Sequence, residues 1–180
     1  FIGKELIKKL NANGHEILIL TRNSDLAKFR IPVHCEIVTW DPVKYSLSPS
    51  VLKGVDAVIN LAGEGIADGR WTIERKQLLV QSRLLSARRL IDAISYMNCK
   101  PKVFLSASAI GFYGDQGDQL LNEESAKGNG FLSEVCQSWE NEIYKAKDFG
   151  IRTVALRIGM VLGHDGGALE KMLPPFQLGV

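Results

Sequence analysis

The chain has 180 residues, of which 46% are hydrophobic and 23% charged, and its formal net charge at pH 7 is +2. Such a small net charge gives no positive electrostatic field strong enough to indicate nucleic-acid binding, and no basic cluster stands apart from acidic residues. The longest apolar runs are too short to cross a bilayer. We therefore expect one soluble, cytoplasmic domain over residues 1–180, with no nucleic-acid or membrane partner.

Cysteine and histidine usage predicts neither a disulfide framework nor a metal site. Cys35, Cys99 and Cys136 are odd in number and widely spaced, which favours reduced thiols. The three histidines have no partners at the spacing of metal ligands. We therefore expect no metal.

The first elements of the chain are a helix and then a strand. Apolar residues recur at helical spacing from Ile2 to Leu10, and Asn13-Gly14 closes the helix. Glu16–Leu20 is a buried strand that ends in Thr21-Arg22-Asn23. Because an α/β chain that starts on a helix lacks the strand before it, we expect the first strand of the sheet to be missing from this chain.

Strands and helices alternate along the rest of the chain. The patterns predict strands at Glu36–Trp40, Val55–Leu61 and Ile151–Leu162, and helices at Trp71–Asn98 and Phe131–Phe149. They also predict a helical turn before Gly54, a turn at Gly163–Gly167 and a helix from Ala168–Met172. This alternation indicates a doubly wound parallel sheet with helices on both faces. The polar stretch Asp115–Gly130 suits a lid or substrate loop.

Lys102–Gly114 concentrates the candidate chemistry. Its apolar run Val103-Phe104-Leu105 fits a strand buried on both faces, and Ser106 and Ser108 follow at the carboxyl end. Open α/β sheets bind their ligands at this edge. Small residues in Ala62-Gly63-Glu64-Gly65 would likewise let a flat ligand approach, although a plain strand-to-loop turn explains them equally well.

Gly3 and Arg22 are candidate dinucleotide contacts. Gly3 lies in the first helical turn, where the last glycine of a dinucleotide-binding turn permits close packing. Arg22 follows the second strand, where an arginine can pair with the 2′-phosphate of the adenosine ribose. This favours NADP(H) over NAD(H), while a solvated arginine at a strand end is the alternative interpretation.

An ordered series of segments covers nearly the whole chain: Phe1-Ile2-Gly3, Arg22, Asn60–Glu64, Gly69-Arg70-Trp71, Ser82-Arg83, Ser106–Gly114, Phe131-Leu132, Trp139-Glu140, Arg157–Gly163 and Gly166–Leu169. In this order the chain resembles the extended short-chain dehydrogenase/reductase superfamily of NAD(P)-dependent nucleotide-sugar epimerases and dehydratases. It is most similar to their atypical "epimerase family" branch.

The resemblance implies a Rossmann-like sheet with NADP(H) across its carboxyl edge. It puts Gly3 near the pyrophosphate, Arg22 at the adenosine end and Leu61, Ala62 and Gly63 along the cofactor, with Ser106 beside it. It also implies further residues before Phe1 and a substrate-side segment after Val180.

The resemblance gives Ser108 the position of the catalytic serine or threonine that hydrogen-bonds the substrate carbonyl or alcohol. The superfamily also carries Tyr-x-x-x-Lys on the next helix, where the lysine lowers the pKa of the tyrosine. Setting Glu140 on the family's downstream glutamate puts Leu132 and Cys136 at these two positions. Tyr113 is then the candidate substitute proton carrier, although a turn aromatic is more often a pocket wall.

Three functions are compatible with these residues. The first is an NADP-dependent epimerase or reductase that acts on a small carbonyl or sugar-like substrate with non-standard proton transfer. The second is a non-catalytic NADP(H)-binding regulatory or redox-sensing protein, and the third is a domain that binds a different nucleotide. The resemblance also implies that helices Trp71–Asn98 and Phe131–Phe149 could form a homodimer interface, although their outer faces have a solvated pattern.

Overall fold

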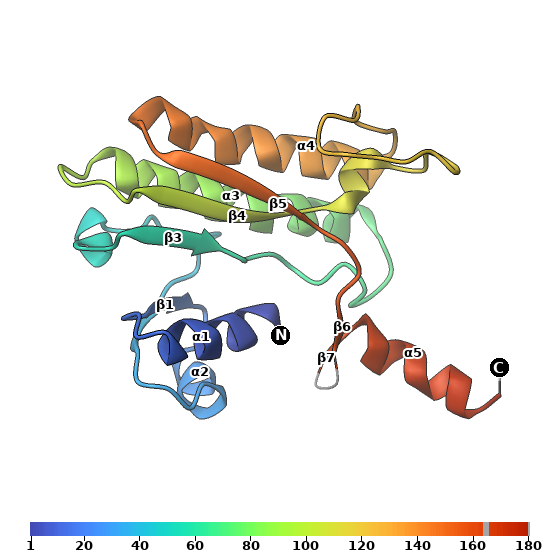
Figure 1. The fold of residues 1–180 in the computed structure, drawn as a ribbon, viewed down its shortest axis with the longest axis horizontal. Helices are drawn as coiled ribbons and strands as arrows, with labels where there is room; N and C mark the ends of the chain where they lie inside the picture. Colours follow the sequence, from blue (N-terminus) through green and yellow to red (C-terminus); the bar gives the residue numbers. More distant parts are fainter. Residues whose placement is uncertain (164–165, 180) are drawn as a thin grey trace. The chain divides into compact units, whose positions relative to one another are not determined.

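The computed structural model describes residues 1–163 and 166–179 and confirms the predicted parallel sheet with flanking helices (Figure 1). The helices are α1 (Ile2–Ala12), α2 (Ser24–Arg30), α3 (Ile73–Ser95), α4 (Phe131–Tyr144) and α5 (Ala168–Gln177). The strands are β1 (Leu18–Thr21), β2 (Glu36–Thr39), β3 (Ala57–Asn60), β4 (Val103–Ala109), β5 (Arg152–Ile158), β6 (Leu162–Gly163) and β7 (Gly166–Gly167). Short 3-10 helices are η1 (Pro49–Leu52), η2 (Ile110–Tyr113) and η3 (Lys145–Phe149). Among the described residues, no helix is both long and apolar enough to span a bilayer.

The chain divides into two compact units, and the first comprises residues 1–41 and 160–180. It contains the two-stranded parallel sheet β1–β2. The helix α2, which the sequence patterns did not predict, follows β1 because Asn23 caps it: the Asn23 side-chain oxygen accepts from Leu26 N at 2.9 Å. At only seven residues, α2 is too short to show a clear helical period.

The carboxyl part of the first unit is a small antiparallel pair, β6–β7, followed by α5. The Phe1 ring occupies the space that a side chain at Gly163 or Gly166 would need, so a larger residue at either position would displace that ring. The predicted turn at Gly163–Gly167 includes residues 164–165, which lie outside the described residues. The predicted helix at Ala168–Met172 is confirmed and continues to Gln177.

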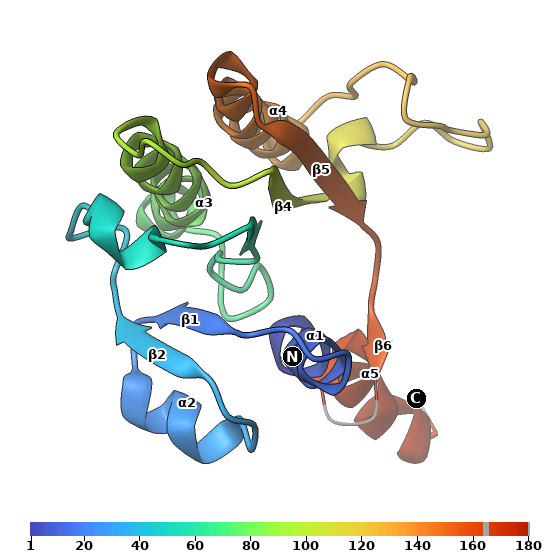
Figure 2. The same ribbon diagram turned by 60° about the vertical axis from the view of Figure 1, so that its left-hand side comes forward.

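The second unit, residues 42–159, contains the parallel sheet β3–β4–β5. The helices α3 and α4 both lie on one side of this sheet (Figure 2). Side chains that are fully buried in this unit include Phe104 of β4, Leu79 and Ile94 of α3, and Ile143 of α4. Burial of these large apolar groups supplies the main driving force for packing the two helices on the sheet.

Element boundaries differ from the predicted ones by a few residues. The strand predicted at Val55–Leu61 is shorter, as β3, and the last predicted strand stops at Ile158. The helix predicted over Phe131–Phe149 is α-helical only to Tyr144 and continues as η3. Gly150, with a φ of +74°, ends it in a left-handed conformation that favours glycine.

Candidate functional site

Ser108 lies near the end of β4 beside a buried ion pair. In the parallel ladder Ser108 is opposite Arg157 of β5, so the two side chains leave the same face of the sheet. The Glu140 carboxylate of α4 meets both: Oε1 accepts from Ser108 Oγ at 2.6 Å and from Arg157 Nε at 2.9 Å. Its Oε2 accepts from Arg157 Nη2 at 2.9 Å. Ser108 is 3% exposed and Glu140 is 4% exposed. Three elements are therefore joined at one buried point, which we call the Ser108 cluster (Ser108, Glu140 and Arg157).

The remaining nitrogen of the Arg157 guanidinium, Nη1, donates hydrogen bonds to the segments that follow β4. Its Nη1 donates to Tyr113 Oη at 2.8 Å and to the backbone carbonyl of Glu123 at 3.2 Å. Its Cζ lies 3.6 Å from the centroid of the Phe112 ring. The hydrogen bonds to Glu140 raise the pKa of Arg157 above its ordinary value, so the side chain remains a cation.

Sequence reasoning used Glu140 and Arg157 only as parts of the resemblance and gave neither residue a role in the site. A signal was present, because Arg157 interrupts an apolar strand and a buried charge needs a partner. The identity of that partner could not be read from periodicity, since Glu140 lies 17 residues away on another element.

Tyr113, the predicted proton carrier, is 8% exposed and lies at the end of η2. Arg157 connects it to the Ser108 cluster. Because the Tyr113 oxygen accepts from Arg157, the phenolic hydrogen remains available for donation to another group. Its ring also packs edge-on against Phe112, with centroids 5.4 Å apart.

Leu132, Cys136 and Glu140 recur at intervals of four residues and share one face of α4. This face packs against the turn after β4: a Cβ built on Gly111 would lie 3.4 Å from Leu132 Cβ and 3.8 Å from Cys136 Sγ. Burial raises the pKa of the Cys136 thiol, which keeps it neutral and unreactive. Neither Leu132 nor Cys136 therefore offers a group suited to move a proton at neutral pH.

The polar loop between η2 and α4 is closed at its base. Ser133 Oγ lies 2.7 Å from Phe112 O and 2.8 Å from Gly128 O, and Gly128 N donates to Phe112 O at 3.0 Å. A side chain at Gly128 would overlap the Tyr113 carbonyl, so this position requires glycine. Together with the bond from Arg157 to Glu123, these contacts tie the loop to the Ser108 cluster.

Ser106 lies two residues before Ser108, is 1% exposed and bonds to Asn60. Asn60 Nδ2 lies 3.3 Å from Ser106 Oγ and 3.2 Å from Ser86 Oγ of α3. Asn60 Oδ1 accepts from Ala62 N at 3.2 Å. This buried polar group fixes the turn that leads from β3 into Leu61, Ala62 and Gly63.

The loop after Gly63 is fastened to α3. Glu64 N donates to Ser82 Oγ at 3.1 Å, and Arg83 Nη2 donates to Glu64 O at 2.9 Å. A Cβ built on Gly63 would lie only 3.3 Å from Arg83 Cζ, so a larger residue would displace the arginine. Burial lowers the pKa of Arg83.

Gly3 and Arg22 lie in the first unit. Gly3 is in the first turn of α1, whose N-cap residue makes no side-chain capping bond. Arg22 is exposed and follows β1 directly, in a turn where Asn23 N donates to Thr21 Oγ1 at 3.3 Å. Each residue therefore stands on the kind of element expected for it, a helix start and a strand end.

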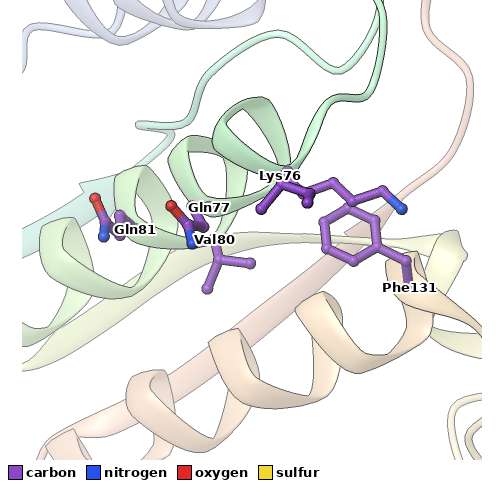
Figure 3. Close-up of a pocket in the computed structure, with 6 residues that line it drawn as sticks. Lys76, Gln77, Val80, Gln81 and Phe131 are labelled. Atoms are coloured by element: carbon purple, nitrogen blue, oxygen red, sulfur yellow. The ribbon is translucent and has the colours of Figure 1, made fainter.

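A groove of about 330 Å³ lies between the first turns of α3 and α4, and six residues line it: Ile73, Lys76, Gln77, Val80, Gln81 and Phe131. Figure 3 shows Val80 and Phe131 reaching toward each other from the two helices. The Lys76 ammonium lies 5.2 Å from the Phe131 ring centroid. Ile73 is 73% exposed, so the outer face of α3 carries an exposed apolar side chain as well as solvated charges.

The model of the NAD dependent epimerase/dehydratase family matches residues 1–177. The chloroplastic homolog of epimerase family protein SDR39U1 from Arabidopsis thaliana is 38% identical over 183 residues, covering 99% of this chain and 51% of that protein. The crystal structure of human epimerase family protein SDR39U1 (isoform 2) with NADPH is similar with a TM-score of 0.80 and 32% identity, over 99% of this chain and 57% of that one.

A nucleoside-diphosphate sugar epimerase from Corynebacterium glutamicum is 27% identical with a TM-score of 0.68, over 96% of this chain and 41% of its own. The chain thus spans about half the length of these relatives. Its parallel sheet and flanking helices are Rossmann-like, and the chain belongs to the NAD dependent epimerase/dehydratase family.

Proposed function

We propose that this protein is an NADP(H)-dependent epimerase or reductase of sugar-like substrates that works without the usual Tyr-x-x-x-Lys pair. The observation that carries the proposal is the Ser108 cluster, where a serine at the carboxyl end of a parallel strand is fixed by Glu140 and Arg157. The C. glutamicum relative is a nucleoside-diphosphate sugar epimerase, which supports a nucleoside-diphosphate sugar as the substrate class.

NADP(H), in preference to NAD(H), is the proposed cofactor, and it would supply hydride transfer. NADPH is present in the human relative's structure. Arg22 is an exposed guanidinium at a strand end, which suits a 2′-phosphate. Gly3 lies at the start of a helix, where backbone N–H groups can bind a phosphate. Leu61, Ala62 and Gly63 form a turn whose backbone a flat ligand could approach. Ser106, the remaining proposed contact, is hydrogen-bonded to Asn60, which precedes that turn.

For the substrate, we assign Ser108 to a hydrogen bond with the reacting oxygen and Tyr113 to proton transfer. By the resemblance to the superfamily, with Glu140 set on its downstream glutamate, Leu132 and Cys136 take the places of Tyr and Lys, and neither can carry a proton at neutral pH. Tyr113 retains its phenolic hydrogen because its oxygen accepts from Arg157.

A non-catalytic NADP(H)-binding regulator or redox sensor is the second candidate. The apolar Leu132 and the buried thiol of Cys136 favour it, because they leave the usual acid–base position empty of a proton carrier. Steady turnover of NADPH with any carbonyl compound would exclude it.

Fluorescence titration of the full-length protein with NADPH and NADH tests the cofactor. We expect NADPH to bind more tightly, and Arg22→Ala to weaken NADPH by roughly tenfold or more while leaving NADH unchanged, since a charge-assisted bond to phosphate is lost. Arg30→Ala, at an exposed arginine that ends α2, is the matched control. Binding of neither nucleotide would overturn the proposed function.

A further inference from the structure

The hydroxyl of Ser108 has its hydrogen committed inside the protein. Its oxygen lies 2.6 Å from Glu140 Oε1, and an ionised carboxylate can only accept hydrogen bonds. The hydrogen of this pair must therefore come from Ser108. The Ser108 oxygen can therefore still accept a hydrogen bond from a ligand, but it has no hydrogen left to donate.

Glu140 is held in place by Arg157. Two N–H groups of the guanidinium donate to the two carboxylate oxygens, in the bidentate geometry that arginine and carboxylate favour. The guanidinium is itself fixed by Tyr113 Oη, by the Glu123 carbonyl and by the face of Phe112. Neither partner is free to rotate away and release the Ser108 hydrogen.

An acceptor-only serine discriminates between the two oxidation states of a substrate. An alcohol can donate its hydroxyl hydrogen to Ser108, whereas a carbonyl oxygen would face the serine lone pairs without any hydrogen between them. A buried site built for a hydroxyl binds an analogue that lacks the donor more weakly, because its own polar group is left unpaired.

We propose that Glu140, held by Arg157, is a positioning residue that makes Ser108 a hydrogen-bond acceptor, so that the site binds its substrate as the alcohol in preference to the carbonyl. This inference deepens the proposed function and rests on it, because it takes Ser108 as the substrate contact.

The first test needs no ligand. Infrared spectra of the full-length protein with ¹³C-labelled glutamate isolate the carboxylate bands, and Glu140→Gln identifies the band of Glu140. We expect Ser108→Ala to shift that band, because the hydrogen bond is lost, and Ser108→Thr to leave it in place. An unshifted band in Ser108→Ala would overturn the inference.

The second test measures whether a ligand hydroxyl donates a hydrogen bond to Ser108. UDP-glucose and its four monodeoxyfluoro analogues are titrated into the NADP⁺-saturated full-length protein, since fluorine replaces a hydroxyl at similar size but cannot donate. We expect one analogue to bind at least about tenfold more weakly than UDP-glucose. The ratio of the two dissociation constants should fall to below about threefold in Ser108→Ala and in Glu140→Gln. In Glu140→Gln the side-chain amide places a hydrogen-bond donor against either Ser108 or Arg157.

Asp92→Asn, at an exposed carboxylate on α3, is the control and should keep the full ratio. Equal affinities across the series, binding of none of the five, or a ratio unchanged in Glu140→Gln would overturn the inference. NADPH titration of the same proteins separates the two levels: normal NADPH binding with a flat fluoro series refutes this inference alone, and loss of NADPH binding in the wild type refutes the proposed function.

Discussion

Arg157 is a charged residue on a strand of largely apolar residues, and β5 can bury most of it because Glu140 lies opposite on α4. The exposed fractions of the two side chains are 17% and 5%. Removing two charges from water is costly, and the fork of two N–H bonds offsets that cost only while both partners are present. The same pair fixes the Ser108 hydroxyl, so stability and site geometry depend on one interaction.

Arg157→Met should therefore lower the free energy of unfolding by about 3 kcal/mol, because it leaves the buried Glu140 carboxylate uncompensated. The double variant Arg157→Met with Glu140→Leu should lose less than the sum of the two single changes, since no charge remains buried. Urea denaturation measures all three, with Arg152→Met at an exposed position of the same strand as control. Additive losses would contradict this account of the pair.

Ion pairs between the helices also make the stability of the fold depend on pH. Glu142 of α4 is buried, and its carboxylate accepts from Arg88 Nε and Nη2 of α3 at 3.1 and 3.0 Å and also from Lys145 Nζ. Burial alone would raise the pKa of Glu142, but the hydrogen bonds from Lys145 and Arg88 outweigh it and lower the pKa below its ordinary value.

A carboxyl group with a lowered folded-state pKa stabilises the fold above its unfolded pKa of about 4.3, and this contribution is lost as pH falls through the folded value. We therefore expect Glu142→Gln to destabilise the protein at pH 7 and to flatten the loss of stability below about pH 4.3. Thermal unfolding across this pH range, with the exposed Glu124→Gln as control, measures the effect. A pH profile parallel to the wild type would refute it.

The elements themselves were largely predictable, because helices and strands repeat apolar residues at fixed periods. The long helix α3 and the strand β4 stand out in the sequence, and the Ser106-Ser108 end of β4 was placed correctly. The helix α2 was missed because it is short and its start depends on one side-chain cap at Asn23. The Ser108 cluster was only half predictable, since Ser108 and Glu140 are 32 residues apart and meet through packing rather than period.

At the scale of the whole molecule, the groove between α3 and α4 leaves apolar surface on the two helices proposed for a homodimer interface. We propose that these helices form a homodimer interface in the full-length protein. Val80→Glu would then bury an unpaired charge in that interface and should shift the protein from dimer to monomer. Tyr96→Glu, at an exposed residue that ends α3, should leave the dimer intact. Sedimentation velocity measures the state, and a monomeric wild type would refute the dimer.

The proposed function requires the site beside Ser108 to carry out redox chemistry with Tyr113 as its proton carrier. The most direct measurement is turnover by the full-length protein, followed as NADPH oxidation with a panel of carbonyl compounds and as epimerisation of sugar nucleotides, since an epimerase returns its hydride and consumes no NADPH. We predict steady turnover with at least one compound, reduced about a hundredfold in Tyr113→Phe and unchanged in Tyr45→Phe, at an exposed tyrosine. No turnover with any compound, or equal turnover in Tyr113→Phe, would contradict the account.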